Sequence, residues 1–180
     1  MLTVIAGPMF AGKTSTLIDR PGSIVFKPTI DTRDGLDVIR THDGRERMAV
    51  PVAYAADLDQ MIPMTVHTVC LDEAQFFGPE VLPAIERMQR QGLQVIAVGL
   101  DLDSEGKPFG IMPALLSMAT EVIKARAVCA VCSDPATRTY RKTAVGEQVL
   151  IGGSETYEPR CLECWSEGQA MRGSAGLNGS

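Results

Sequence analysis

The chain has 180 residues, with 17 Lys and Arg against 22 Asp and Glu, a net charge of −5 and 45% hydrophobic side chains. This length suits one main domain with a small appendage, and the acidic balance argues against a passive nucleic-acid binder, whose affinity comes from clustered cations. No stretch approaches the roughly 18 uncharged apolar residues of a membrane-spanning helix, and the apolar start predicts a strand rather than a signal peptide, so we expect a soluble, cytoplasmic protein.

Short apolar runs alternate with helix-like segments through the first two thirds of the chain. We predict strands at residues 2–6, 24–26, 68–71, 94–100 and 121–124. We predict helices at 79–91, which has an early proline, an apolar stripe and Gly92 after its end, and at 113–118. This alternation indicates an α/β fold in which helices cover both faces of a parallel sheet.

The composition changes after residue 124. Two Cys pairs, a Thr/Arg-rich segment and a Gly-Gly pair predict a small, loop-rich, mostly β appendage at 125–165. Residues 166–180 are rich in Gly and Ser and lack periodicity, so we expect a frayed, flexible tail. The predicted organisation is therefore a main domain at 1–124, the appendage at 125–165 and the tail at 166–180.

The first predicted strand runs into a segment that matches G-x-x-x-x-G-K-[ST]. Its residues are Gly7, Pro8, Met9, Phe10, Ala11, Gly12, Lys13 and Thr14. A match between a strand and a helix-like stretch is typical of a phosphate-binding P-loop, and this context disfavours an ordinary glycine turn with a solvated lysine. Backbone amides would face phosphate oxygens, Lys13 would supply charge between the β- and γ-phosphates, and the Thr14 hydroxyl would serve Mg²⁺.

Two acidic residues follow the buried strand predicted at 68–71. Asp72 occupies the position of a Walker B carboxylate, which holds Mg²⁺ in P-loop proteins. Glu73 follows at the carboxyl edge of the sheet, where a carboxylate that is not bound to the metal can accept a proton from an attacking hydroxyl or water. An Asp-Glu pair alone is common in exposed loops. The P-loop in the same chain favours the interpretation of this pair as part of a nucleotide site.

The cysteines of the appendage form two C-x-x-C units. Cys129 and Cys132 make the first, and Cys161 and Cys164 make the second. Four thiolates can surround a tetrahedral Zn²⁺ and leave no position for substrate, so we predict a structural zinc site. Unrelated buried cysteines or a redox pair are the alternatives, and neither C-x-x-C opens the βαβ unit typical of redox motifs.

Together these motifs resemble the type II thymidine kinases. The similar segments are GPMFAGKT at 7–14, FKPTIDTR at 26–33, LDEAQFF at 71–77, GKPFG at 106–110, both Cys pairs and LIGGSETY at 150–157. The resemblance covers residues 2–165. It implies a RecA-like P-loop domain with a zinc-binding lasso domain, and an enzyme that transfers the γ-phosphate of ATP to the 5′-hydroxyl of thymidine.

The resemblance also implies a role for particular residues. Glu73 would be the general base, Thr14 and Asp72 would serve Mg²⁺, and Asp31, Arg33 and Gln75 would join the P-loop in binding ATP. The lasso would read thymine largely through its main chain. The residues implied in substrate binding are Phe76, Ser104, Phe109, Thr139, Gln148, Val149, Leu150, Ile151, Gly152 and Tyr157.

The implied partners are ATP and thymidine, with thymidine triphosphate as a feedback inhibitor, a homotetrameric assembly, and neither nucleic acid nor membrane. The implied cofactors are Mg²⁺ with ATP and a structural Zn²⁺. Two features depart from the family pattern: Ser104 replaces an aromatic residue, and only nine residues separate Thr14 from Ile24. Because a parallel crossover needs about a dozen residues or more, either the P-loop helix is truncated or residues are missing.

Three other functions remain possible from the residues alone. A nucleic-acid-dependent P-loop ATPase with a zinc ribbon also combines these motifs, although the acidic composition disfavours it. A GTPase lacks support because the chain has no Asn-Lys-x-Asp segment. A catalytically inactive binding module is compatible with the short crossover and with Ser104.

Overall fold

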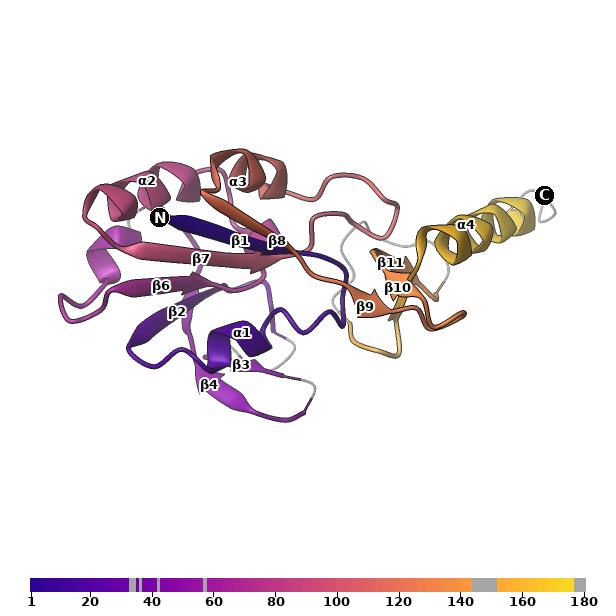
Figure 1. The fold of residues 1–180 in the computed structure, drawn as a ribbon, viewed down its shortest axis with the longest axis horizontal. Helices are drawn as coiled ribbons and strands as arrows, with labels where there is room; N and C mark the ends of the chain where they lie inside the picture. Colours follow the sequence, from indigo (N-terminus) through magenta and orange to yellow (C-terminus); the bar gives the residue numbers. More distant parts are fainter. Residues whose placement is uncertain (33–34, 36, 42, 57, 144–151, 177–180) are drawn as a thin grey trace.

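The computed structural model describes the chain except residues 33–34, 36, 42, 57, 144–151 and 177–180 (Figure 1). Its centre is a parallel sheet whose six strands lie in the order β5-β2-β6-β7-β1-β8. Their bounds are β1 (Leu2–Ala6), β2 (Ser23–Pro28), β5 (Val50–Val52), β6 (Thr68–Leu71), β7 (Gln94–Gly99) and β8 (Glu121–Lys124). The prediction of a parallel α/β sheet is thus confirmed.

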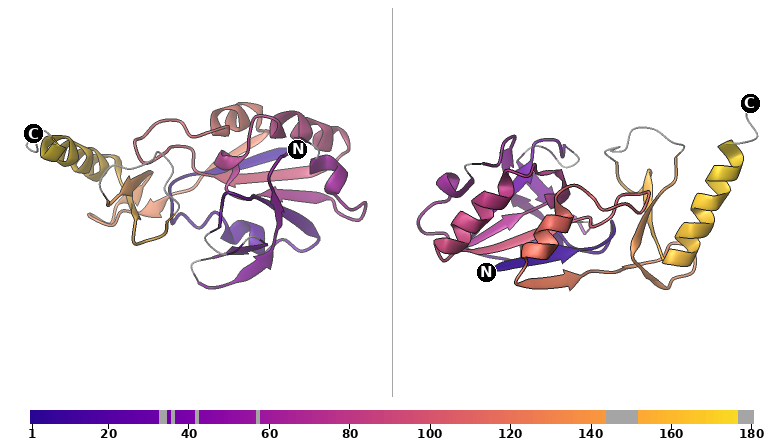
Figure 2. Two further views of the ribbon diagram at one scale, coloured as in Figure 1. Left: turned by 180° about the vertical axis from the view of Figure 1, so that it is seen from behind. Right: turned by 90° about the horizontal axis from the view of Figure 1, so that it is seen from above.

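One face of the sheet is covered by the longer helices, α2 (Val81–Arg90) and α3 (Met112–Met118), as Figures 1 and 2 show. Two 3₁₀ turns, η1 (Leu58–Met61) and η2 (Ala74–Phe76), join this layer. Helix α2 forms because its apolar residues recur at helical spacing, and Ile85 and Met88 are fully buried while Glu86 is exposed. These residues and the sheet side chains below them, including Leu71, form the larger core cluster.

The opposite face has a much smaller cover. It consists of the single-turn helix α1 (Ser15–Ile18) and a hairpin of β3 (Val38–Arg40) and β4 (Glu46–Met48). Leu17 from α1 and Ile39 from the hairpin pack on Cys70 and Ile96 of the sheet in a second, smaller cluster. Both faces are therefore covered, as a parallel sheet requires.

In the short crossover between β1 and β2, a single arginine side chain caps the carbonyl end of α1 and the turn that follows it. The guanidinium of Arg47, on β4, donates hydrogen bonds to the carbonyl oxygens of Leu17 at 2.6 Å, Arg20 at 2.8 Å and Ser23 at 2.5 Å. The last carbonyls of a helix have no partner within the helix, and a cation there also suits the helix dipole. Arg47 thus provides one shared hydrogen-bond donor for three backbone carbonyls along the short crossover that follows α1.

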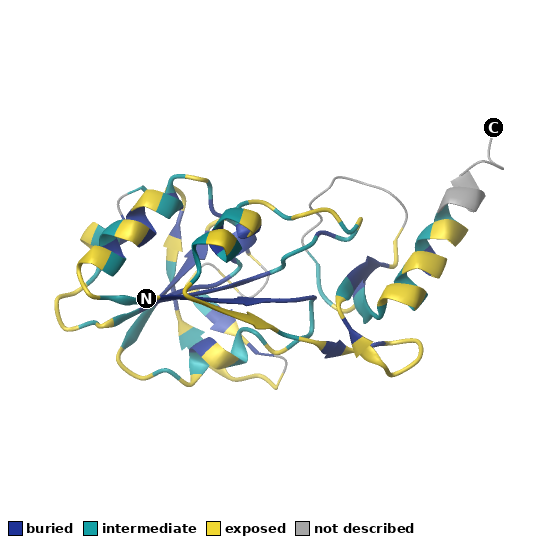
Figure 3. Cartoon of the chain, turned by 45° about the horizontal axis from the view of Figure 1, so that its top comes forward, coloured by how far each residue is buried: buried dark blue, intermediate teal, exposed yellow. Residues whose placement is uncertain are grey.

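Beyond β8 the chain forms two small antiparallel pairs and a helix. Strand β9 (Ala127–Val128) pairs with β10 (Pro135–Ala136), and β11 (Arg138–Arg141) pairs with β12 (Tyr157–Arg160). The central strands are mostly buried, whereas the C-terminal helix is mostly exposed or partly exposed (Figure 3). Across the described residues, no helix has the length and apolar character needed to cross a bilayer.

The expected tail requires a correction, because residues 166–176 belong to helix α4 (Leu162–Gly176). Contacts with the rest of the chain explain why this segment is ordered. The Arg172 guanidinium lies 4.4 Å from the centroid of the Tyr140 ring, and the Tyr140 hydroxyl donates to the Gly168 carbonyl at 3.3 Å. The Trp165 indole donates to the Ser104 carbonyl at 3.2 Å, which ties the helix to the main domain.

Candidate active site

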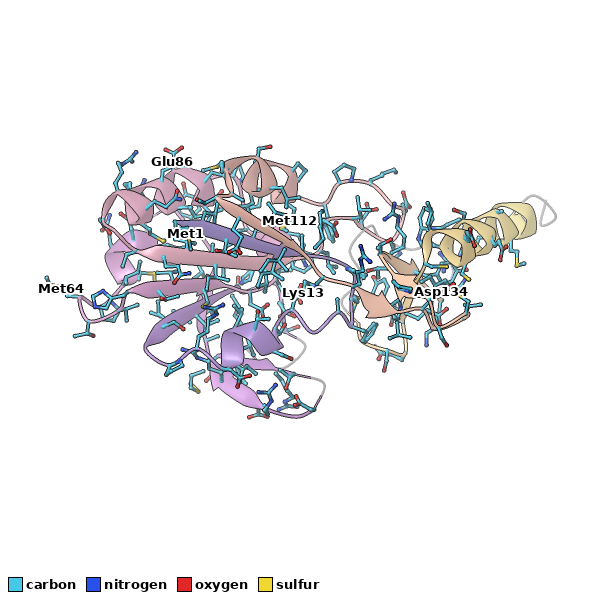
Figure 4. All side chains as sticks on the ribbon, viewed as in Figure 1. Met1, Lys13, Met64, Glu86, Met112 and Asp134 are labelled. Atoms are coloured by element: carbon cyan, nitrogen blue, oxygen red, sulfur yellow. The ribbon has the colours of Figure 1, made fainter. Side chains whose placement is uncertain are left out.

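A cleft of about 620 Å³ opens at the carboxyl ends of β1, β2, β6 and β7. This is the edge at which open α/β sheets bind ligands. Lys13 lies on the side of the sheet that faces the C-terminal part, which contains Asp134 (Figure 4). The cleft is lined by Met9, Phe10, Ala11, Gly12, Lys13, Thr14, Ser15, Asp31, Ile39, Arg40, Thr41, Asp72, Glu73, Gly99, Leu100, Gly152, Gly153 and Glu155.

The P-loop follows β1 and curls around one end of this cleft. Phe10 and Gly12 have positive φ angles of 65° and 69°, so the backbone leaves the usual right-handed region twice within three residues. The Lys13 ammonium donates to the Pro8 carbonyl at 2.6 Å, across its own loop. Gly7 and Pro8 form the start of the turn, and the remaining six residues of the motif line the cleft.

Thr14 and Asp72 come together although 58 positions separate them in the chain. The Thr14 hydroxyl donates to Oδ1 of Asp72 over 3.4 Å, a long hydrogen bond. The Asp72 backbone amide donates to the Phe26 carbonyl at 2.9 Å, which holds the carboxylate at the end of the sheet. Hydroxyl and carboxylate oxygens are the hard ligands that Mg²⁺ accepts along with water and phosphate oxygens, so this pair fits the ion.

Glu73 lies beside Asp72 in the cleft wall. Its backbone is left-handed, with φ of 49° and ψ of 46°, and its amide donates to Oδ1 of Asp72 at 3.0 Å. A non-glycine residue in this conformation is uncommon and persists only where its surroundings hold it. A carboxylate here can accept a proton from a hydroxyl bound in the cleft.

Asp31 is buried in the wall opposite the P-loop, and Lys27 holds it there. The Lys27 side chain is fully buried and its ammonium lies 3.3 Å from Oδ2 of Asp31. It also donates to the carbonyls of Gly35 at 2.9 Å and Val38 at 3.1 Å, so one ammonium shapes the loop that follows β2. Arg33, predicted to bind phosphate, lies outside the described residues.

Gln75, placed by resemblance with the ATP-binding residues, does not border the cleft as the structure describes it. Its side chain is 3% exposed and its amide contacts Glu73 and the backbone of Leu100. Phe76, at the end of η2, meets Phe109 edge to face, with ring centroids 5.5 Å apart. These two predicted substrate residues are therefore brought together by the fold.

Thr139 connects the C-terminal part to the P-loop. Its hydroxyl, buried to 3% exposure, accepts a hydrogen bond from the Met9 backbone amide at 3.1 Å. Gly152 lines the cleft, whereas Tyr157 is buried on β12 and its hydroxyl accepts from Arg141 at 3.2 Å. Ser104 offers its carbonyl to α4. The predicted substrate residues Gln148, Val149, Leu150 and Ile151 lie outside the described residues.

Four polar residues that the sequence did not single out also line the cleft: Ser15, Arg40, Thr41 and Glu155. Arg40 forms an ion pair with Glu46 at 2.5 Å across the β3–β4 hairpin. The Gly153 amide donates to Glu155 at 2.6 Å and lowers the pKa of that carboxyl. Glu155 lies within LIGGSETY, so that motif could have indicated it, whereas Arg40 carries no comparable sequence signal.

The four appendage cysteines converge on one point. Their sulfur atoms all lie within 4.8 Å of one another, which fits a single tetrahedral zinc ion. Burial opposes ionisation of Cys129, but backbone amides of Cys132, Cys161 and Val131 outweigh it and lower the Cys129 pKa to about 6. The pKa of Cys164 is raised, above all by its contact with Cys161. Cys129 is therefore the cysteine that most readily becomes a thiolate, the form that binds a metal.

The comparison with known families agrees with this geometry. The family model described as Thymidine kinase matches residues 1–165. The matched range includes the P-loop, the Thr14–Asp72 pair, Glu73 and both Cys pairs, and it ends within α4. The chain belongs to the thymidine kinase family.

Proposed function

We propose that this chain transfers the γ-phosphate of ATP to the 5′-hydroxyl of thymidine. Membership of the thymidine kinase family supports the reaction class. The observation that carries the proposal is the meeting of the P-loop, the Thr14–Asp72 pair and Glu73 in one cleft. Phosphoryl transfer needs this set of groups: a phosphate cradle, a metal site and an acceptor for the proton of the attacking hydroxyl.

In the proposed reaction the thymidine 5′-oxygen forms a bond to the γ-phosphorus, the bond from that phosphorus to the β–γ bridging oxygen breaks, and ADP leaves. Glu73 takes the proton of the 5′-hydroxyl. Lys13 turns from the Pro8 carbonyl toward the phosphates, where its charge stabilises the transferring group. Thr14 and Asp72 would hold Mg²⁺, which would supply positive charge to offset the charge of the phosphates.

The C-terminal part supplies the thymidine side of the cleft in this proposal. Gly152, Gly153 and Glu155 line the same cleft as the P-loop, and the Thr139–Met9 hydrogen bond joins the C-terminal part to that loop. The predicted contacts of residues 148–151 with the base, and of Ser104 and Tyr157 with the substrate, remain part of the proposal. Zinc bound by the four cysteines would pin both ends of this segment.

The resemblance to the family also supports further properties of this protein. We propose that the chain assembles as a homotetramer, lies in the cytoplasm and is inhibited by thymidine triphosphate. Its partners would be ATP and thymidine rather than nucleic acid. The organisation into a nucleotide-binding domain at 1–124 and a lasso domain at 125–165 is proposed with them.

The test is a product assay with purified protein, Mg-ATP and each of the four natural deoxynucleosides, with a reaction lacking acceptor. We expect thymidine monophosphate to form selectively. Glu73→Ala should lower kcat by roughly 10²- to 10⁴-fold, the range that general-base catalysis contributes. Glu86→Ala is the matched control, because Glu86 is exposed on α2, away from the cleft.

Two results would contradict the proposal. Formation of ADP without any nucleoside monophosphate, especially if DNA stimulates it, would support the nucleic-acid-dependent ATPase instead. Full turnover by Glu73→Ala would remove Glu73 from the role of base.

A further inference from the structure

Gln75 is a buried polar residue next to the proposed base. Its side chain is 3% exposed, while Glu73, two residues earlier, lines the cleft. A buried amide is costly unless its donors and acceptor are engaged. The partners of this amide therefore indicate what Gln75 does.

The backbone of β7 fixes the orientation of the Gln75 amide. The Leu100 N–H, at the carboxyl end of that strand, donates to Oε1 of Gln75 at 2.9 Å. Because a backbone N–H can only donate, the amide oxygen must face Leu100 and the NH₂ group must face the other way. That NH₂ group donates to Oε2 of Glu73.

The surrounding backbone is shaped to admit Gln75. A Cβ on Gly99 would lie 2.6 Å from Oε1 of Gln75, and a Cβ on Gly110 would lie 2.0 Å from the Gln75 carbonyl oxygen. Gly110 also has a φ of +50°. Glycine at these two positions therefore leaves room for Gln75 to pack between β7 and the loop before α3.

We propose that Gln75 is a positioning residue that holds the Glu73 carboxylate in place for proton abstraction. The inference rests on the proposed function, because it assigns Gln75 to the general base of that reaction. Leu100 anchors the amide to the rigid sheet, and the amide anchors the carboxylate. Gln75 acts through Glu73 and makes no contact with the nucleotide.

The backbone of Glu73 makes such an anchor useful. Its left-handed conformation sets the direction in which the side chain leaves the main chain, and the long Glu side chain still has several rotamers from that point. A catalytic group displaced by about 1 Å can lose roughly 10²-fold in rate. A hydrogen bond from a fixed amide selects one position.

Gln75→Glu tests the contact with little change in shape. The new carboxylate can still accept from the Leu100 N–H, but it replaces the donor to Glu73 with a second acceptor. We expect kcat to fall by roughly 10- to 100-fold, part of the whole general-base contribution, with the KM for ATP unchanged. Gln91→Glu introduces the same charge at an exposed position after α2 and should leave both constants unchanged.

A double variant separates a positioning role from an independent one. In the Glu73→Ala background Gln75→Glu should lower kcat no further, because no base remains to be positioned. A raised KM for ATP with unchanged kcat in Gln75→Glu would show that Gln75 binds nucleotide and would overturn the inference. Wild-type kcat in that variant would overturn it as well.

A spectroscopic measurement tests the contact even if thymidine is not the substrate. The side-chain NH₂ signals of Gln75 can be identified in a ¹⁵N–¹H correlation spectrum by their disappearance in Gln75→Glu. They should shift in Glu73→Ala and stay in place in Glu86→Ala. Unmoved signals in Glu73→Ala would overturn the positioning role, whereas a wild-type protein without thymidine kinase activity but with the shift would overturn only the proposed substrate.

Discussion

The central sheet and the part of the chain beyond β8 are stabilised in different ways. The sheet buries large side chains on both faces, such as Phe26 and Leu71 on one face and Ile96 on the other. Among the residues that the structure describes, the apolar cluster of the C-terminal part has three buried members, Ala127, Cys129 and Ala136. Hydrophobic stabilisation scales with the apolar area buried. We therefore expect the sheet to be stabilised by its core, and the C-terminal part to require a metal bound by its four cysteines.

This difference matters because the cleft draws residues from both parts. The P-loop, Asp72 and Glu73 follow strands of the sheet, whereas Gly152, Gly153 and Glu155 come from the C-terminal part. The Thr139–Met9 and Trp165–Ser104 hydrogen bonds join the two. The proposed phosphate chemistry is thus built on the sheet and its core, and the wall proposed for thymidine would depend on a metal bound by the four cysteines.

The largest expected effect is the loss of zinc from Cys129→Ser. Structural zinc contributes about 10–16 kcal/mol of binding free energy in zinc-finger peptides, and the C-terminal part has little apolar burial to replace it. We expect zinc content to fall and the β9–β10 and β11–β12 pairs to lose protection in hydrogen exchange, while β1, β6 and β7 keep theirs.

Cys70→Ala is the matched control, because Cys70 is buried in β6 and lies outside the cysteine cluster. Its zinc content should stay unchanged. Equal zinc content in Cys129→Ser and the wild type would contradict the four-cysteine site.

The zinc affinity should fall steeply as pH falls, because the thiols must lose protons to bind the metal. Burial and contacts with Cys129 and Cys161 oppose the backbone amide of Asp134 and raise the Cys132 pKa to about 11, and the Cys164 pKa is raised too. At neutral pH both therefore release protons on binding. Cys129, with its pKa lowered to about 6, is already a thiolate and competes with protons only below that pH.

Competition with a colorimetric chelator between pH 5 and 8 checks this dependence. Each released proton contributes roughly tenfold in affinity per pH unit, so we expect at least a hundredfold loss per unit above pH 6 and a steeper loss below it. A constant slope through pH 6 would contradict the low pKa of Cys129.

In the other part, Ile85→Ala should destabilise the sheet without affecting the metal. Ile85 is fully buried between α2 and the sheet, and such truncations cost about 2–5 kcal/mol. Denaturant unfolding should show this loss with an unchanged zinc content. Glu86→Ala, at the adjacent exposed position, should change stability by less than about 0.5 kcal/mol; loss of zinc in Ile85→Ala would contradict the separation of the two parts.

A smaller effect is expected from Arg47→Ala. The variant leaves the carbonyls of Leu17, Arg20 and Ser23 without their shared donor, which should cost about 1–3 kcal/mol and weaken ATP binding through the P-loop helix. Arg45→Ala, which removes an exposed pair with Asp19, should cost less. Equal stability of the two variants would show that the cap does not support α1.

The sequence predicted well the features that depend on local pattern. The apolar runs located every strand of the central sheet except β5, whereas the short strands of the β3–β4 hairpin and beyond β8 were not predicted individually. The P-loop, acidic and cysteine motifs located the elements from which the cleft and the cysteine cluster are built. Strand β5 was missed because Pro51 lies within it, and proline is tolerated there only because β5 is the edge of the sheet. Its position becomes visible only once the sheet is assembled.

Features that depend on tertiary contacts could not be predicted. Residues 166–176 have three glycines and no apolar stripe, and they are helical because Tyr140, Arg160 and the Ser104 carbonyl hold α4 in place. Gln75 belongs to a motif that resemblance assigned to ATP, and only the Leu100 and Glu73 contacts show its surroundings. Arg47 likewise has no signal in the sequence as a cap for α1.

The most direct test of the division between the two parts removes zinc from the wild-type protein with a chelator. Binding of a non-hydrolysable ATP analogue and phosphorylation of thymidine are then measured on the same sample, before and after zinc is restored. We predict that nucleotide binding persists while thymidine phosphorylation is lost and returns with zinc. Phosphorylation at the original rate without zinc, or loss of both properties together, would contradict the account.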